Sequence, residues 1–330
     1  MNITVIGGGG YVGSLLVPAL IDENYKVSVI DLFIFGSPEK VFGHHFKNKN
    51  LTCIRGDVRD LDLVESTIKN SNTIIHLACI SNDPSFELNP NLGKSINYDC
   101  FLPLLKMCKK KKIQRFVYAS SSSVYGIKDE ASVTEDLICD PLTDYSKYKL
   151  MCEEILLNES NNNLCATVLR PATVCGFSLR TRLDVIVNIL TNHAYNKKKI
   201  TIFGGSQKRP NIHIKDMVRA YLAVLKEKTS NISDQIFNVG YQNYTLNQIS
   251  QMVIECTDQN IEVNHEPTDD LRSYHVSSKK ISNKINFKPL YSVEDAISDL
   301  CLAFKNGLLP NSFNDPRYFN IKTMQKIKLI

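Results

Sequence analysis

The sequence predicts an α/β fold in which helices cover a doubly wound parallel sheet. Two observations carry this prediction. Short apolar runs typical of strands alternate with helix-like segments through the first half of the chain, and a cluster of glycines joins the first run to the first helix. The strands predicted in this half span residues 2–6, 25–30, 51–55, 73–77, 115–119 and 164–169.

The first 31 residues form a predicted strand, helix and second strand, with glycines at the first turn. Gly7, Gly10 and Gly13 fit the spacing G-x-x-G-x-x-G, and Gly8, Gly10 and Gly13 fit G-x-G-x-x-G. Because glycine has no Cβ atom, either spacing permits a tight turn and brings backbone N–H groups close to a phosphate at the helix N-terminus. The unit therefore predicts a Rossmann-type site for the pyrophosphate of a dinucleotide.

Asp31 ends the second predicted strand, where a carboxylate accepts hydrogen bonds from the hydroxyl groups of the adenosine ribose. The same carboxylate repels a 2′-phosphate, and no arginine follows it directly, so the sequence favours NAD over NADP. Asp57 follows the third strand, where it could contact the adenine amino group, cap the next helix, or do both. Further residues at these turns are predicted to line the cofactor: Tyr11, Val12, Val58, Leu77, Ala78 and Cys79.

The charge of the chain bears on its binding partners, and its cysteine content bears on disulfides and metal sites. Lys and Arg number 39 against 34 Asp and Glu, which gives a formal net charge of +5 spread along the chain. This mild excess does not indicate a nucleic-acid or membrane partner, but it suits an anionic substrate. None of the ten cysteines has C-x-x-C spacing, so we expect free thiols and no metal site. No apolar run is long enough to cross a membrane and the first strand starts at once, so we predict a cytoplasmic protein without a signal peptide.

Tyr145 and Lys149 open a predicted helix over residues 144–158 and, being four residues apart, share one face of it. An ammonium group beside a phenol favours the phenolate and lowers the pKa of the tyrosine. Tyr145 could therefore act as a general base near neutral pH. The pattern is weak alone, and it gains weight because it follows the glycine unit and a run of serines at 120–123.

Taken in order, these motifs resemble the extended short-chain dehydrogenase/reductase family, and within it the nucleotide-sugar epimerases and dehydratases. The resemblance implies a catalytic triad of Ser121, Tyr145 and Lys149, with Pro171 packed beside the nicotinamide. It also implies that NAD oxidises a sugar at C4. The matching segments cover nearly the whole chain and comprise residues 7–13, 56–58, 76–78, 120–126, 145–149, 169–176 and 209–216.

The resemblance further implies that the substrate is a nucleotide-diphosphate sugar. Arg209 matches the arginine that grips the diphosphate in epimerases, a task that suits a guanidinium group. Arg180 and Arg182 are weaker candidates for the same anion. Asp270 and Arg272 resemble a late pair that contacts the ribose and the diphosphate. Four more residues are predicted to contact substrate: Ser81, Asn82, Ser122 and Thr173.

We expect residues 1–170 to form the NAD-binding domain, completed by segments around 205–245. Residues 171–330 should form mainly a smaller α/β substrate-binding domain. The resemblance implies a homodimer that associates through the predicted helices at 91–110 and 145–158. For the tail from residue 310 onward, the sequence predicts only surface packing.

Several chemistries follow from a 4-keto sugar, and C4 epimerisation is the first choice. Ser122 and Ser123 stand where the family's 4,6-dehydratases carry two acids, and its decarboxylases also use an acid there. The alternative is a nucleotide-sugar 4-dehydrogenase, because residues 170–188 resemble a bacterial subgroup that acts on GDP-heptose, and Thr173 replaces an asparagine of galactose epimerases. A non-catalytic NAD-binding regulator is disfavoured, since Tyr145 and Lys149 are both present. The resemblance also suggests a role in cell-surface polysaccharide biosynthesis.

Overall fold

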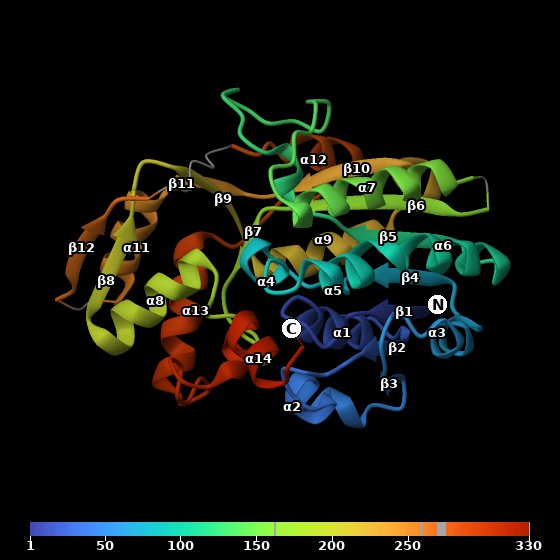
Figure 1. Cartoon of the computed structure of the whole chain (residues 1–330), viewed down its shortest axis with the longest axis horizontal. Helices are drawn as coiled ribbons and strands as arrows, with labels where there is room; N and C mark the ends of the chain where they lie inside the picture. The colour runs from blue at the N-terminus through green and yellow to red at the C-terminus, as the bar shows by residue number, and fades with distance from the viewer. Residues whose placement is uncertain (162, 258–259, 269–274, 330) are drawn as a thin grey trace.

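The computed structural model describes residues 1–161, 163–257, 260–268 and 275–329. Within these residues a seven-stranded sheet, parallel throughout, has the order β10-β6-β5-β4-β1-β2-β3 (Figure 1). The order reverses direction beside β1, which makes the sheet doubly wound. Its strands are β1 (Asn2–Ile6), β2 (Lys26–Asp31), β3 (Leu51–Arg55), β4 (Thr73–His76), β5 (Arg115–Ala119), β6 (Cys165–Pro171) and β10 (Gln235–Val239).

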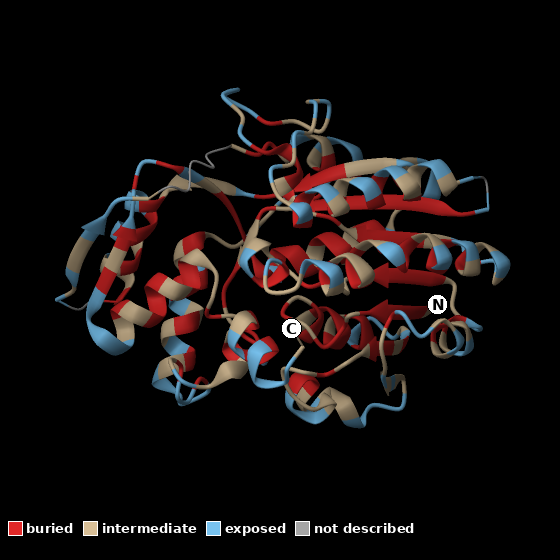
Figure 2. Cartoon of the chain, viewed as in Figure 1, coloured by how far each residue is buried: buried red, intermediate tan, exposed pale blue. Residues whose placement is uncertain are grey.

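Helices cover both faces of this sheet, so the predicted fold class is confirmed. Neighbouring side chains of β1 point to opposite faces. Ile3 and Val5 belong to a buried cluster with α1 (Gly13–Asp22) and α9 (Ile214–Lys226). Ile6 belongs to a second cluster, with α3 (Leu61–Ile68), α6 (Phe101–Lys110) and α7 (Asp144–Glu159). Figure 2 shows the central strands as almost continuously buried.

A smaller α/β region follows β6. It holds a three-stranded sheet in the order β11-β9-β7 and a two-stranded sheet of β12 and β8, with three helices packed around one apolar cluster. Its elements are β7 (Thr173–Cys175), α8 (Ile186–Lys197), β8 (Lys199–Phe203), β9 (Lys208–His213), β11 (Gln242–Thr245), α11 (Leu246–Thr257), β12 (Glu262–Glu266) and α13 (Val293–Lys305). The chain returns to the large sheet through α9 and β10 between β9 and β11.

The remaining helical elements are short. They lie in the loops of the large sheet and near the C-terminus. The short helices are α2 (Pro38–Phe42), α4 (Asp83–Phe86), α5 (Pro90–Lys94), α10 (Thr229–Ile232), α12 (Lys279–Ile285) and α14 (Asn320–Lys326).

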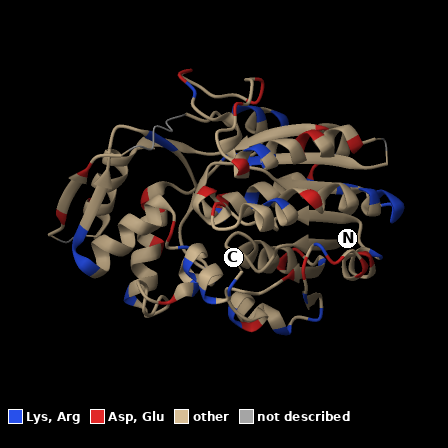
Figure 3. Cartoon of the chain, in the orientation of Figure 1, with Lys and Arg blue, Asp and Glu red and all other residues tan. Residues whose placement is uncertain are grey.

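Figure 3 shows acidic and basic residues spread over the whole ribbon, with a basic group at the end of α6.

The single helix predicted over residues 91–110 is interrupted. A π-helical turn, Ser95–Asp99, separates α5 from α6. Asn97 in this turn is buried, and its carboxamide accepts from the backbone nitrogen of Ile80 at 2.8 Å and donates to the backbone oxygen of Ile80 at 3.0 Å. The wider turn therefore satisfies the backbone of the loop that follows β4, in line with the frequent use of π turns at functional sites.

A buried ion pair joins β6 to α7. Arg170 and Glu153 approach to 2.6 Å, and their side chains are 3% and 1% exposed. Ser120, the residue after β5, donates a hydrogen bond to the same carboxylate, and Arg170 also donates to the hydroxyl of Tyr125 at 2.8 Å. This network fixes the end of β5 against α7, where the predicted catalytic residues lie.

Removing one member of this buried pair should cost much stability. Arg170→Met leaves the Glu153 carboxylate buried without its cation, and we expect it to lower the free energy of unfolding by about 3–5 kcal/mol. Lys199→Met is the matched control, because the Lys199–Glu262 pair is exposed and should be worth below about 1 kcal/mol. Urea unfolding of both variants measures the difference, and similar small losses would contradict this account of the network.

Candidate active site

The carboxyl ends of the large sheet open into a cavity of about 410 Å³. In a doubly wound sheet this edge is where ligands bind. The turns after β1, β3 and β4 contribute to the lining, together with the ends of β2, β5 and β6 and the start of α7. Segments from outside the sheet complete it, among them the loop before α8 and parts of α9 and α14.

The glycine turn after β1 leaves no room for side chains at two positions. A Cβ atom on Gly7, whose φ is +84°, would lie 2.3 Å from the backbone nitrogen of Ala78. A Cβ atom on Gly13 would lie 2.2 Å from the carbonyl oxygen of Gly8. The backbone thus forms a bare cradle at the N-terminus of α1, and this geometry fits the pyrophosphate of a dinucleotide.

Asp31 ties the end of β2 to the glycine turn. Its carboxylate accepts hydrogen bonds from the backbone nitrogens of Gly9, at 2.8 Å, and Phe33, at 2.6 Å. Burial raises the pKa of this carboxyl group, whereas the two backbone hydrogen bonds act to lower it. Asp31 lines the cavity, where the sequence predicts its contact with ribose.

Asp57 also lines the cavity, but one of its two predicted roles is wrong. The residue that caps α3 is Asp60, whose side chain accepts from the backbone nitrogen of Leu63. Asp57 instead pairs with Arg59 at 2.6 Å, and this hydrogen bonding lowers the pKa of the Asp57 carboxyl group. The sequence offered two aspartates three residues apart, and the later one has the capping geometry.

The structure brings together the three residues of the predicted triad. Tyr145 and Lys149 lie in the first turns of α7, which begins with a capping box formed by Thr143 and Ser146. Ser121 directly follows Ser120 at the end of β5, and its hydroxyl accepts a hydrogen bond from the backbone nitrogen of Ser123 at 3.1 Å. Ser121 and Tyr145 line the same cavity. Lys149 is buried, and its Nζ atom donates to the backbone oxygen of Ala119 at 2.6 Å.

The expected effect of Lys149 on the pKa of Tyr145 is not what the structure shows. Burial raises the pKa of the Tyr145 phenol well above its usual range, and Cys79 and Asp83 raise it further. Arg182 and the hydrogen bond with Ser121 act in the opposite direction. The ammonium of Lys149 lies 6.0 Å from the centre of the Tyr145 ring and is bound to a carbonyl oxygen, so the neutral phenol is favoured in this arrangement.

Most other predicted site residues line the same cavity. For the cofactor these are Gly10, Tyr11, Val12, Val58, Leu77, Ala78, Cys79 and Pro171. For the substrate they are Ser81, Asn82, Ser122, Thr173 and Arg182. Arg209 lies half-buried on β9 and is not part of this lining, so its contact with a diphosphate stays a prediction. Asp270 and Arg272 lie outside the described residues.

The C-terminal tail, expected only to pack on the surface, contributes to the site. Asn320 and Met324 of α14 line the cavity, as does Leu329. The backbone nitrogen of Asn320 donates to Asp184 at 2.7 Å, which ties the tail to the loop before α8. α8 itself begins at Ile186, two residues after Asp184. The contribution of the tail to the site has no local sequence signal, because it depends on contacts between segments far apart in the chain.

The described residues show neither a membrane-spanning helix nor a candidate metal site. In the described part of the chain, no helix has the length and apolar character needed to cross a membrane. The same residues contain no group of three or more His, Cys, Asp or Glu side chains that could hold a metal ion. All ten cysteines are free thiols.

The glycine turn can be tested by adding single methyl groups. Gly13→Ala should lower the free energy of unfolding by about 1–3 kcal/mol, because the new Cβ atom forces the backbone at Gly8 to shift. It should also weaken NAD binding, since the turn would no longer present its N–H groups correctly. Gly10→Ala is the stability control, because its Cβ atom would lie 3.5 Å from its nearest neighbour. Urea unfolding and calorimetric titration measure both effects, and equal stability of the two variants would contradict the account.

Comparisons with known proteins agree with this site. The chain is 27% identical to the UDP-glucose 4-epimerase of Corynebacterium glutamicum, over 93% of this chain and 97% of that protein. It is 33% identical to an uncharacterised UDP-glucose epimerase of Bacillus subtilis, over 68% of this chain and 72% of the relative. The structure is similar to that of UDP-glucuronic acid 4-epimerase from Bacillus cereus in complex with UDP-glucuronic acid and NAD. There the TM-score is 0.83 and the identity 27%, over 93% of this chain and 99% of the other.

The model of the NAD-dependent epimerase/dehydratase family matches residues 3–240, which include the glycine turn, the triad and β10. This match spans more than half of the chain. NAD is the cofactor of this family, and the bare cradle at the glycine turn fits it. The chain belongs to the NAD-dependent epimerase/dehydratase family.

Proposed function

We propose that this protein is an NAD-dependent nucleotide-sugar epimerase that acts at C4. The observation that carries the proposal is the convergence of Ser121, Tyr145 and Lys149 on one cavity with the glycine turn and Pro171. Such an arrangement sets a proton acceptor beside the position where a dinucleotide exchanges hydride. The relatives named above, which include epimerases of UDP-sugars, support the same activity.

The residues of the chain have separate tasks in this proposal. The chemistry that NAD supplies when bound is reversible acceptance of a hydride from C4 of the sugar. Tyr145 takes the proton from the O4 hydroxyl, and Ser121, which lines the same cavity, orients that hydroxyl. Once the sugar is a 4-keto compound, Tyr145 holds the proton until it returns to O4. Epimerisation requires the keto sugar to present its other face before the proton and the hydride are given back.

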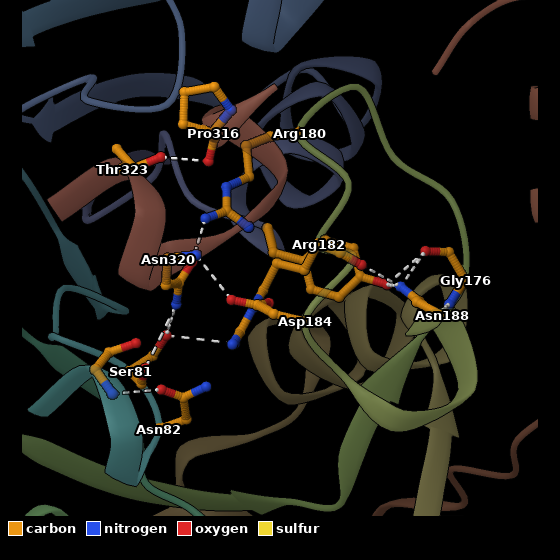
Figure 4. Close-up of polar contacts among 12 residues, drawn as sticks. Ser81, Asn82, Gly176, Arg180, Arg182, Asp184, Asn188, Pro316, Asn320 and Thr323 are labelled. Atoms are coloured by element: carbon orange, nitrogen blue, oxygen red, sulfur yellow. Dashed lines mark hydrogen bonds and ion pairs between the residues drawn. The ribbon is translucent and has the colours of Figure 1, made fainter. Parts of the chain in front are cut away.

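Tyr145 needs a nearby positive charge to work as a base, because burial favours its neutral phenol. Of the cations that line the same cavity, Lys149 and Arg182 are the two near Tyr145 that can supply this charge. Arg182 already lowers the pKa of Tyr145. It also donates to Asp184 at 2.8 Å and to the hydroxyl of Ser81 at 3.3 Å, so its guanidinium is held at the substrate side of the cavity (Figure 4).

The serines after Ser121 favour epimerisation over elimination of water or loss of CO2. Ser122 is buried and Ser123 is half-buried, and neither can act as the acid that those reactions use at this place. The carboxylates that line the cavity come from other places in the chain: Asp31 ends β2, Asp57 follows β3 and Asp83 begins α4.

The finer points of the proposal follow the family resemblance. The substrate is a nucleotide-diphosphate sugar. It is held by Arg182 and by the other residues that the sequence predicts to contact substrate. Residues 1–170 with parts of 205–245 bind NAD, and the smaller α/β region binds the sugar nucleotide. The protein works as a cytoplasmic homodimer in the synthesis of cell-surface polysaccharide.

The activity can be tested with a panel of UDP-, GDP-, CDP- and dTDP-sugars, followed by chromatography of the products. We expect one of them to be converted to its C4 epimer. Tyr145→Phe should lower the rate by about 10²–10⁴-fold, because the proton acceptor is lost, while NAD stays bound. Tyr148→Phe on the same helix is the control, since Tyr148 stacks on Tyr98 and does not line the cavity.

Two outcomes would contradict the proposal in different ways. Stoichiometric release of reduced dinucleotide with a keto sugar would identify a 4-dehydrogenase. Failure of every sugar both to react and to reduce NAD would favour a regulator that only binds the dinucleotide.

A further inference from the structure

The network around Asn320 connects the C-terminal tail to the cavity (Figure 4). The side-chain oxygen of Asn320 accepts a hydrogen bond from Nη2 of Arg180 at 2.5 Å. Its side-chain nitrogen donates to the hydroxyl of Ser81 at 2.9 Å, and its backbone nitrogen donates to Asp184. Asn320 is therefore held from three sides, and it fixes the direction of the Arg180 side chain.

Arg180 is a buried cation that forms no ion pair with the described residues. The residue is 4% exposed, and its guanidinium lies 3.6 Å from the centre of the Phe35 ring. Within the described part of the chain, its Nε and Nη1 atoms have no hydrogen-bond partner. Burial, together with the nearby charge of Arg182, lowers the pKa of Arg180 to about 9. A buried charge of this kind is costly unless an anion pairs with it, and Arg180 lines the cavity where an anion would bind.

We propose that Arg180 binds the pyrophosphate of NAD from the side opposite the glycine turn, and that Asn320 is the positioning residue that holds it there. The guanidinium is a planar donor that matches two phosphate oxygens at once. The neighbours of Arg180 favour the cofactor over the substrate as the source of the phosphate. Its guanidinium lies over the ring of Phe35, four residues beyond Asp31 at the end of β2. The charged groups around it are Arg182 and Asp184, and then Tyr11 of the glycine turn and Asp31.

Arg182 differs from Arg180 in its surroundings, although the two are close in sequence. It reaches Ser81 and influences Tyr145, which places it at the sugar end of the cavity. In this proposal Arg180 therefore binds the cofactor and Arg182 binds the substrate. The inference rests on NAD binding alone and does not need the proposed reaction at C4.

Calorimetric titration of the full-length protein, after removal of any bound dinucleotide, tests the proposal. Arg180→Met should weaken NAD binding by about 10–100-fold, because a charge-assisted pair of hydrogen bonds is lost. The same variant should unfold at equal or higher urea concentration without NAD, since an unpaired buried cation has been removed. A merely structural role for Arg180 predicts that stability falls instead, and that result would overturn the proposal.

The choice of ligand identifies which phosphate Arg180 holds. ADP-ribose should lose affinity as NAD does, whereas adenosine, which lacks phosphate, should bind both proteins equally. UDP binding in the presence of NAD should not change. If UDP affinity falls and NAD affinity does not, Arg180 holds the substrate diphosphate and the proposal is wrong. Arg317→Met is the matched control, because Arg317 precedes α14, pairs with Asp315 and does not line the cavity.

A double-mutant cycle tests the role of Asn320. If Asn320 acts through Arg180, Asn320→Ala should weaken NAD binding less than Arg180→Met does. Adding Asn320→Ala to Arg180→Met should then cause little further loss. Additive losses in the double variant would show that Asn320 contributes to NAD binding on its own account, and would overturn its assignment as the positioning residue.

Discussion

The close approach of backbone segments at the turn between β1 and α1 is the constraint on which the rest of the site depends. Gly7 lies against the backbone of Ala78, and Gly13 against that of Gly8, at separations that no Cβ atom permits. The Asp31 carboxylate then ties the end of β2 to the same turn. Three strand ends are thereby held around one cradle of N–H groups, and this geometry fits the pyrophosphate of NAD.

Buried polar contacts determine how the reacting side chains meet that cradle. Asn97 holds the loop after β4 through the backbone of Ile80, and the Arg170–Glu153 pair holds the end of β5 against α7. Ser121 follows β5 and Tyr145 lies in the first turn of α7, so this packing brings the two residues next to each other. Because Tyr145 is buried, its neutral phenol is favoured in this arrangement. In the proposed reaction, the cations around the cavity therefore supply the positive charge that Tyr145 needs to act as a base. The glycine turn forms the part of the site that suits a dinucleotide, and the buried polar contacts hold Ser121 and Tyr145 in position beside it.

The sheet, the glycine turn and the shared helix face of Tyr145 and Lys149 could be predicted, because strand patterns and short spacings express them locally. That Ser121 joins them could be predicted only from the resemblance to a known family. The features that could not be predicted depend on contacts between distant segments. The π turn around Asn97 allows hydrogen bonds to the backbone of the loop after β4, which lies outside the helix itself. The lining contributed by Asn320 depends on hydrogen bonds to Asp184 and Ser81, which no pattern in a short helix reveals. Asp57 was misread as a possible cap because Asp60 offers the same chemistry one turn later.

The central claim is that hydride leaves C4 and returns to the same sugar on its other face. The most direct measurement uses the nucleotide sugar that reacts, carrying deuterium at C4, with mass spectrometry of sugar and dinucleotide after turnover. The account predicts that the epimerised sugar retains the deuterium at C4 and that no labelled dinucleotide accumulates. Deuterium in released reduced dinucleotide, with an unlabelled keto sugar as product, would contradict it.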